Sequence, residues 1–600
     1  MKQIKNRSLF ALMGMGIILV VASLSMLYII DYPLTRSKTI NFPDTNGDIL
    51  VGEYTPGNRL AGVLILEGFG SDQIAMKSIA SEFASIGFHV FTFDFSGQGR
   101  SSGSLGFDNA ATYRLAKQVI IAKNQFRLLS GLPDSRIIMV GHSMGARVAL
   151  QSATLDPNPV GGLILLGTQV NLEVNVQSDF FTGVSDLNLL WVLNLTAINP
   201  PVDILLLSGS WDDILRPSAA KKLYYKLGAE LSPYTRDLII YEHIFHNYEI
   251  YDPILISDAI NWALRELGLD LTPNYFAAKA LIRKALWIVA LIGFILIPIA
   301  GIKYIHGLQK ENKNKNKNKN KNKNKNKNKN KNKNESKIPK DEKNEKNKIS
   351  EKTKITTVTG EEELFNVQIT NLKKFLGYKL LAWLGSLPIA LGLISSFFLI
   401  PIGLPVFSLF YVGFLGSYGI FMIILYLKNK MPGTEGNFSI KLGSSKFKKD
   451  ENNLLAISSA ILFISASMFF YNSGINFVFP MNTSRALWLI IFTILTIPGF
   501  YIGQKEAKML KISGYDKKRS QFSLSVIGLV PFFGISILFA AIGSISGMIG
   551  SLQGILILIF VFLSGNFILK LASNSSIAII YQSFLIQLLV LTQGSLFTIF

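Results

Sequence analysis

A glycine-flanked serine motif, Gly141-His142-Ser143-Met144-Gly145, is the part of the sequence that most directly predicts chemistry. It follows an apolar run over residues 137–140 and precedes a helix-prone stretch over 146–153. In this context a G-x-S-x-G motif turns sharply from strand to helix, which exposes the serine hydroxyl above the sheet and near the positive end of a helix. We therefore predict that Ser143 is the nucleophile of an acyl-transfer reaction.

A pair of aspartates supplies the candidates for the acid of a catalytic triad. In sites built on such a turn, the acid follows the serine along the chain and the histidine follows the acid. Asp212 and Asp213 come after a predicted strand at 202–208 and before a helix that begins with Pro217. We expect Asp212 to be the acid because of its spacing from Gly209, with Asp213 as the alternative. The aspartate that is not the acid would cap the following helix.

The chain has five histidines, and two of them, His243 and His246, follow the last predicted strand. His246 leads into the final helix of this region and is the preferred base, with His243 as the alternative. His246 would take the proton of Ser143 and pass it to the leaving group. Asp212 would orient the imidazole ring and stabilise its charged form.

Acyl transfer also requires N–H donors for the negatively charged oxygen of its intermediate. Met144 directly follows the nucleophile, and its backbone N–H is the first expected donor. The second is expected from the loop after the strand at 62–67, which reads Glu67-Gly68-Phe69-Gly70-Ser71. Phe69 is the preferred residue of that loop, with Gly70 as the alternative.

Residues 62–267 resemble the α/β-hydrolase superfamily, above all its branch of serine aminopeptidases, monoacylglycerol lipases and related esterases. Besides the serine motif, residues 93–103 are similar to the loop that this branch writes as D-x-R-G-x-G-x-S. Ser96 stands where arginine is usual, and Glu67 stands where histidine is common before the oxyanion glycine. The resemblance implies an esterase or lipase-like serine hydrolase, and Glu67 bears on the geometry of its loop more than on the chemistry.

Short apolar runs alternate with longer helical stretches over residues 31–271, which predicts a doubly wound, mostly parallel α/β sheet. Several runs lack polar alternation, as strands buried on both faces of a sheet do. Strands are expected at 62–67, 89–93, 136–141, 161–167, 202–208 and 237–241, and helices at 73–85, 109–129, 144–153, 217–227 and 253–267.

Residues 167–200 occupy the place where such enzymes insert a cap over the site, and they include apolar stretches at 180–181 and 187–195. Two interpretations stay open. The segment could be a small lid suited to a lipid-like or amphiphilic acyl substrate, or it could consist of helices that merely cover the sheet.

Long apolar segments on both sides of this region predict a multi-pass membrane protein. Residues 1–30 contain an apolar run of about 20 residues, long enough for an uncleaved signal anchor. A removed signal peptide is the alternative, because small residues at Ala22 and Ser23 would permit cleavage. Residues 272–308 contain a second transmembrane helix, and a disordered Lys/Asn-rich linker is expected at 309–372. An all-α membrane domain with about seven helices is expected at 373–600. Its expected spans are 380–400, 404–427, 454–471, 486–503, 521–544, 553–570 and 576–598.

The distribution of lysine and arginine predicts the orientation of these spans in the cell membrane. With the N-terminus inside, the Lys/Asn linker and the lysine-rich loops near 428–449 and 505–519 are cytoplasmic, and the α/β domain is extracytoplasmic. Three basic residues fall on the outer side against the rule: Arg283, Lys284 and Arg485.

The composition excludes several other classes of site. The net charge of +21 could indicate a nucleic-acid partner, but much of it lies at 312–334, where lysine alternates with asparagine without any aromatic residue. Nucleic-acid grooves interleave basic and aromatic residues on a folded face, so we expect no nucleic-acid partner. The absence of cysteine excludes disulfides, thiol nucleophiles and cysteine-ligated metals. The expected spans from Leu380 onward contain no acidic and almost no basic residues, which argues against ion-coupled transport.

The sequence thus predicts a membrane-anchored hydrolase of carboxylic esters, with small-molecule, lipid or amphiphilic acyl substrates and neither a metal nor an organic cofactor. Membrane lipids are the other expected partners; we interpret the Lys/Asn linker as a spacer, and contact with anionic headgroups is its alternative. The alternatives for function are a peptidase or amidase of the same fold, and a non-catalytic hydrolase-like domain that serves a membrane transport or assembly protein.

Overall fold

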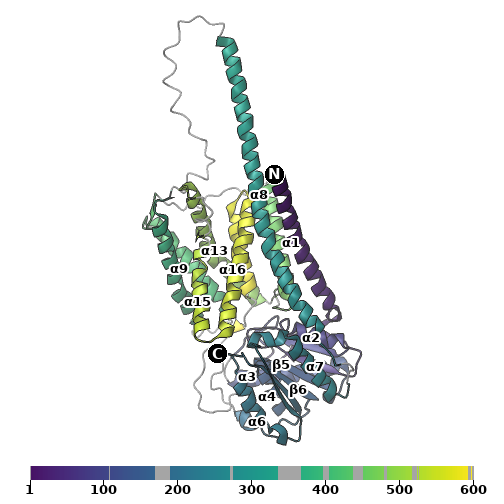
Figure 1. The fold of residues 1–600 in the computed structure, drawn as a ribbon. Coiled ribbons are helices and arrows are strands. Elements are labelled where there is room, and N and C mark those ends of the chain that lie inside the picture. The colour runs from purple at the N-terminus through teal and green to yellow at the C-terminus, as the bar shows by residue number, and fades with distance from the viewer. Residues whose placement is uncertain are drawn as a thin grey trace.

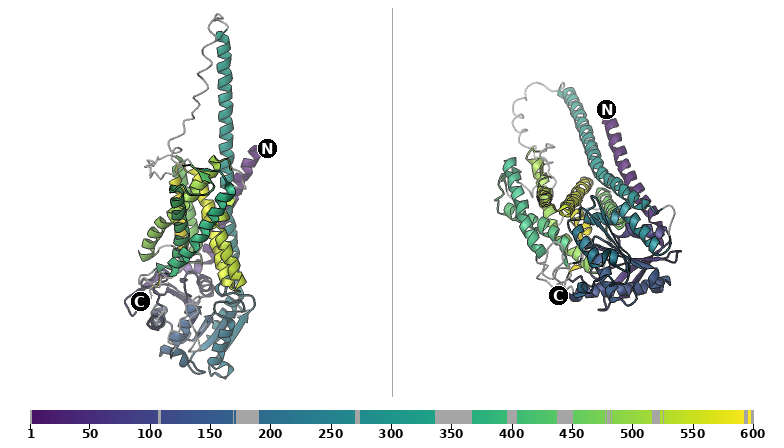
Figure 2. Two further views of the ribbon diagram at one scale, coloured as in Figure 1. Left: turned by 90° about the vertical axis from the view of Figure 1, so that its left-hand side faces the viewer. Right: turned by 60° about the horizontal axis from the view of Figure 1, so that its bottom comes forward.

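The computed structural model describes residues 2–106, 109–168, 190–269, 274–335, 367–395, 404–436, 451–476, 483–515 and 526–591, with a few isolated residues and pairs between them. An α/β domain lies at one end of a bundle of apolar helices (Figure 1). Helix α1 (Lys2–Ile30) leads into this domain and helix α8 (Ala278–Glu335) leads out of it, and the two lie side by side. Figure 2 shows from two further sides that the far end of α8 projects away from the α/β domain.

An eight-stranded sheet forms the centre of the α/β domain, in the order β1-β2-β4-β3-β5-β6-β7-β8. From β4 to β8 in that order all neighbours are parallel, and β1 and β2 add an antiparallel edge. The strands are β1 (Lys38–Pro43), β2 (Ile49–Thr55), β3 (Gly62–Leu66), β4 (His89–Asp94), β5 (Ile137–His142), β6 (Gly162–Leu166), β7 (Asp203–Gly209) and β8 (Arg236–Tyr241). The predicted fold class is confirmed.

Helices cover both faces of the sheet, because its strands present apolar side chains on both faces. Val63 and Ile65 of β3 pack in one core with α2 (Lys77–Ser85) and α7 (Pro253–Glu266). Leu64 and Leu66 pack in the other core with three further helices. These are α3 (Asn109–Ser130), α4 (Met144–Leu155) and α6 (Pro217–Lys226).

The hairpin of β1 and β2 was missed by the sequence analysis. Its turn is built by Asp44, whose carboxylate accepts hydrogen bonds from the N–H groups of Asn46 (2.8 Å) and Asp48 (3.0 Å). Gly47 takes a positive φ of 85° there. The sequence Asp-Thr-Asn-Gly-Asp at 44–48 contains a recognisable Asn-Gly turn signal, so this hairpin could have been predicted.

Seven helices among the described residues are long and apolar enough to cross a membrane, which is consistent with a multi-pass membrane protein. They are Arg7–Ile30, Ala278–Leu308, Leu372–Ile394, Ser408–Leu427, Glu451–Asn472, Thr483–Leu510 and Ile545–Leu571, and the shorter apolar helices Val530–Ala541 and Ser575–Leu591 lie among them. The first two approach closely at glycines: a Cβ on Gly293 would lie 2.7 Å from the carbonyl oxygen of Gly16. Small residues of this kind allow helix backbones to pack tightly in a membrane.

Two features of the helical part differ from the sequence analysis. Helix α8 continues through the Lys/Asn tract to Glu335, where we expected a linker without structure; residues 336–366 lie outside the described residues. A helix nucleated in the membrane can propagate into such a tract, because the cost of nucleation is already met.

The second difference is a buried ion pair. Helices α9 (Leu372–Ser395) and α13 (Thr483–Ile512) extend beyond the expected spans and so include Lys379 and Glu506, which bind each other. The Lys379 ammonium also donates to the hydroxyl of Tyr418 (2.6 Å), and Tyr426 donates to Glu506 (3.1 Å). Opposite charges are therefore paired where the sequence analysis expected none.

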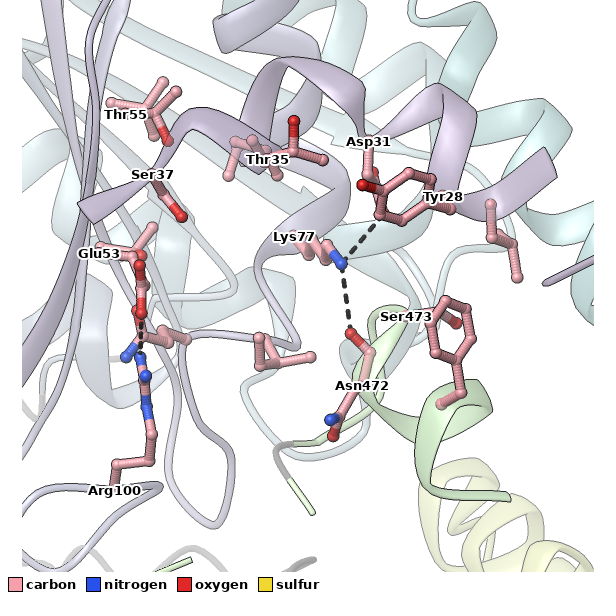
Figure 3. Close-up of a pocket in the computed structure, with 18 residues that line it drawn as sticks. Tyr28, Asp31, Thr35, Ser37, Glu53, Thr55, Lys77, Arg100, Asn472 and Ser473 are labelled. Carbon is pink, nitrogen blue, oxygen red and sulfur yellow. Dashed lines mark hydrogen bonds and ion pairs between the residues drawn. The ribbon is translucent and has the colours of Figure 1, made fainter. Parts of the chain in front are cut away.

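A charged cluster joins the α/β domain to the bundle (Figure 3). Asp31 binds the buried Arg283 of α8 and lies 3.1 Å from the Lys77 ammonium, which also donates to the carbonyl of Asn472. Burial alone would raise the pKa of Asp31, but the charges of Arg283 and Lys77 outweigh it and hold that pKa below its ordinary value. Arg283 also donates to the carbonyl of Ser473, at the end of a membrane helix. A cavity of about 370 Å³ lies beside this cluster, and none of the predicted active-site residues lines it.

Asp31→Asn should destabilise the protein strongly, because it leaves two cations without their buried carboxylate. Removing one partner from a buried pair typically costs about 3–5 kcal/mol. Thermal unfolding of the purified protein in detergent would measure this effect. The exposed pair Arg265–Asp237 is the control, since Arg265→Gln should cost less than about 1 kcal/mol. Equal effects of the two variants would contradict a structural role for the Asp31 cluster.

Candidate active site

Ser143 occupies a sharp turn between β5 and α4. Its backbone has φ 55° and ψ −117°, and its N–H donates to the carbonyl of Leu166 on the neighbouring strand (2.9 Å). The turn requires glycine at Gly145, because a Cβ there would lie 2.5 Å from the carbonyl oxygen of Glu67. The strained turn thus packs directly against the loop that follows β3, as predicted for a nucleophile on this motif.

The structure brings Asp212 and His246 together beside this turn. His246 Nδ1 lies 2.8 Å from Asp212 Oδ2, and both side chains are buried. The other oxygen of Asp212 accepts the N–H groups of Ile214 (3.0 Å) and Leu215 (2.7 Å). The ring of His246 lies 4.7 Å from that of His142, which precedes Ser143. Asp212 and His246 therefore have the geometry of an acid and a base oriented by it.

The electrostatics of His246 suit a base. Burial lowers the pKa of its imidazole, but the hydrogen bond and the charge of Asp212 outweigh burial and raise that pKa above 6.5. Glu249 and Asp213 add to this effect. The charged form that follows proton transfer is consequently favoured at this site.

Two buried groups near the Asp212–His246 pair were not assigned a role from the sequence. Glu249 accepts the N–H of Gly209 (2.8 Å), and burial raises the pKa of its carboxyl to about 8. Burial, with the nearby His246, lowers the pKa of His142 to about 3, so His142 is neutral. His142, His246 and Glu249 are the only set of three potential metal ligands found among the described residues. One ligand atom from each lies within 4.8 Å of the other two, close enough to hold a metal ion. His246 Nδ1 is paired with Asp212 and Glu249 Oε1 accepts the N–H of Gly209, while Glu249 Oε2 lies 3.5 Å from His142 Nε2.

The alternative residues for acid and base lie elsewhere. Asp213 points away from His246 and accepts hydrogen bonds from Ser544 (2.9 Å) and Ser546 (2.6 Å) in the membrane domain. His243 packs edge-on against the ring of Trp211 at a ring distance of 4.8 Å. Neither takes part in the Asp212–His246 pair.

The loop after β3 passes beside Ser143. A Cβ on Gly68 would lie 3.2 Å from the Cβ of Ser143, which puts the next residue, Phe69, close to the serine. Gly70, the alternative oxyanion donor, gives its N–H to the side chain of Gln98 (2.9 Å). Met144 is the first residue of α4, so its N–H has no partner within the helix.

Glu67 joins this loop to the next one. One of its oxygens accepts the N–H of Phe95 (2.7 Å) and the amide of Gln98 (3.0 Å). Burial, reinforced by the charge of Asp94, raises the pKa of the Glu67 carboxyl well above its ordinary value. Glu67 therefore holds the loop after β3 to the loop after β4, at a position where the similar hydrolases commonly have histidine.

The predicted cap at 167–200 lies largely outside the described residues, which resume at Leu190 with the short helix α5 (Leu190–Leu193). Neither interpretation of that segment is tested.

Comparison with known proteins agrees with the fold of the α/β domain. The family model described as serine aminopeptidase, S33, matches residues 57–199. The chain is 28% identical to a monoglyceride lipase homologue of monkeypox virus over 145 residues, which are 24% of this chain and 47% of the viral protein. The chain thus spans about half the length of the curated relative it matches.

Two solved structures illustrate the likeness of the α/β domain. One is the monoacylglycerol lipase of Paleococcus ferrophilus, with 15% identity, a TM-score of 0.30, and coverage of 36% of this chain and 99% of that one. The other is the α/β-hydrolase domain-containing protein 10 of mouse, with 18% identity, a TM-score of 0.29, and coverage of 38% and 99%. The sheet order and the family match agree: the domain has the α/β-hydrolase fold, and the predicted resemblance to the serine aminopeptidase branch is confirmed.

Glu67→Gln should remove a pH dependence of stability. The folded state holds the Glu67 proton more tightly than the unfolded state does, so wild-type stability falls as the pH rises from the ordinary glutamate value through the raised one. Glutamine carries no charge and keeps the accepting oxygen. Unfolding temperatures measured from pH 5 to pH 9 should therefore fall less steeply for the variant. Parallel curves for the two proteins would contradict a protonated Glu67.

Proposed function

We propose that this chain is a membrane-anchored serine hydrolase that cleaves carboxylic esters through an acyl-enzyme intermediate. The observation that carries the proposal is the buried hydrogen bond between His246 and Asp212 beside the strained turn at Ser143. A serine on such a turn becomes a good nucleophile only next to a base that is itself oriented.

The mechanism assigns one role to each residue. Ser143 Oγ attacks the ester carbonyl while His246 takes its proton, and Asp212 stabilises the imidazolium that forms. The N–H groups of Met144 and Phe69 would bind the oxyanion of the tetrahedral intermediate. His246 then protonates the departing alcohol as its bond to the carbonyl carbon breaks. Water repeats the sequence on the acyl-serine and releases the acid.

The substrate class follows from the membrane anchor and the relatives. Similar proteins carry the names monoglyceride lipase homologue and monoacylglycerol lipase. The α/β domain lies at one end of the bundle of apolar helices (Figure 1), where it would meet acyl compounds that partition into lipid. We therefore propose lipid or amphiphilic esters as substrates.

We also propose that the α/β domain lies outside the cytoplasm. The Lys/Asn part of α8 projects from the end of the bundle opposite this domain (Figure 2). Basic segments remain on the cytoplasmic side, so the α/β domain falls on the outer side.

A fluorophosphonate probe tests the nucleophile in intact membranes. The wild-type protein should be labelled, because the probe reacts with activated serines, and Ser143→Ala should lose the label. Ser210→Ala, which changes another serine of this domain, should keep it. An unlabelled wild type, in membranes where a known serine hydrolase reacts, would contradict the proposed function.

Exchange of the acid tests the Asp212 role. Asp212→Asn should lower kcat/KM for a p-nitrophenyl ester by about 10⁴-fold, because the amide favours the wrong imidazole tautomer. Asp213→Asn should have a much smaller effect, since its amide oxygen can still accept the serine hydrogen bonds. The wild-type rate should rise with pH through a midpoint above 6.5, as His246 loses its proton. A larger loss in Asp213→Asn would reassign the acid.

A further inference from the structure

Asp213 connects the acid loop to a membrane helix. Its carboxylate accepts hydrogen bonds from the hydroxyls of Ser544 (2.9 Å) and Ser546 (2.6 Å) and from the N–H of Ser546 (3.2 Å). Ser544 is the N-cap of α16 (Ile545–Leu571), so the carboxylate sits at the positive end of a 27-residue helix. Both the charge and the three donors favour an aspartate there.

The same turn carries the catalytic acid. Asp212 faces His246 while the adjacent Asp213 faces α16, and the carboxylate of Asp212 also accepts the N–H groups of the two residues after Asp213. Residues 212–215 therefore form a compact turn with one carboxylate on each side. Movement of Asp213 would move the backbone from which Asp212 projects.

A second contact reaches the loop that supports the oxyanion donors. Arg485, buried at the start of α13, donates to the carbonyls of Gly97 (3.2 Å) and Leu591 (2.9 Å). Gly97 precedes Gln98, whose side chain binds Gly70 and Glu67 of the loop beside Ser143. The guanidinium thus bridges the membrane bundle and the support of that loop.

We propose that the membrane domain positions the active site, with Ser546 and Arg485 as positioning residues that act through Asp213 and Gly97. The inference rests on the serine-hydrolase function proposed above. Both contacts join segments more than 300 residues apart in the sequence. The contact at Asp213 lies one residue from Asp212, the proposed acid. The contact at Gly97 lies one residue from Gln98, which supports the loop beside Ser143. The membrane domain is therefore more than an anchor: without it, neither loop has its outer support.

Ser546→Ala in the full-length protein tests the proposal. It removes one hydroxyl donor to Asp213 and lies outside the α/β domain. We expect the rate constant of fluorophosphonate labelling and the kcat for a p-nitrophenyl ester to fall about tenfold, with KM unchanged, because small misplacements of catalytic groups cost rate. Ser546→Thr keeps the hydroxyl and should restore the rate. Ser551→Ala changes the same helix at a serine that binds Ser536 instead, and it should leave the rate unchanged.

Hydrogen–deuterium exchange gives a readout independent of turnover: the peptide spanning 209–216 should exchange faster in Ser546→Ala than in Ser551→Ala. If Ser546→Ala keeps the wild-type rates and the wild-type exchange of this peptide, the membrane domain does not position the active site. The proposed serine-hydrolase function would still stand. An equal loss in Ser551→Ala would overturn it as well, because general destabilisation would then explain the effect. A wild type that reacts with no probe would overturn the proposed function and this inference together.

Discussion

The site depends on the close contact between the turn at Ser143 and the loop after β3. No side chain fits at Gly145, since a Cβ would lie 2.5 Å from the Glu67 carbonyl. This contact and the hydrogen bond from the Ser143 N–H to the carbonyl of Leu166 stabilise the strained backbone of Ser143. β3 and β5 are parallel neighbours in the sheet, so their carboxyl ends bring Ser143 and the loop after β3 together. Glu67 and Gln98 then tie this loop to the one after β4. Steric exclusion at Gly145 thus helps to set how closely the turn at Ser143 approaches the loop after β3.

The basic residues that break the positive-inside rule have a common explanation. Arg283 binds Asp31 and the carbonyl of Ser473, Lys284 lies 3.6 Å from Asp252, and Arg485 donates to Gly97. Each reaches a group of the α/β domain, its entry segment or an adjoining turn. A charge at the end of the bundle next to the α/β domain is tolerable when a protein partner neutralises or solvates it. The three basic residues that do not follow the positive-inside rule are therefore residues that join the α/β domain to the helical bundle.

Local sequence signals predicted the parallel strands β3 to β8 and the five helices around them, because apolar runs and helical periodicity report burial directly. The spacing from Gly209 favoured Asp212 as the acid but kept Asp213 as the alternative, because the two share one turn. The fold separates them: Asp212 faces His246 and Asp213 faces α16. Glu249, Gln98 and Lys379 were missed for a related reason, since their partners lie far away in sequence. The extension of α8 through the Lys/Asn tract was missed because composition describes an isolated segment, not one continued from a stable helix.

The central claim is that Ser143 carries the acyl group during ester cleavage. Rapid mixing of the full-length protein with a p-nitrophenyl ester, followed by acid quench and peptide mass spectrometry, tests it most directly. The account predicts a burst of p-nitrophenol stoichiometric with protein, and the acyl mass on the peptide that contains Ser143. Steady ester cleavage with no burst and with the acyl group on another residue, or on none, would contradict it.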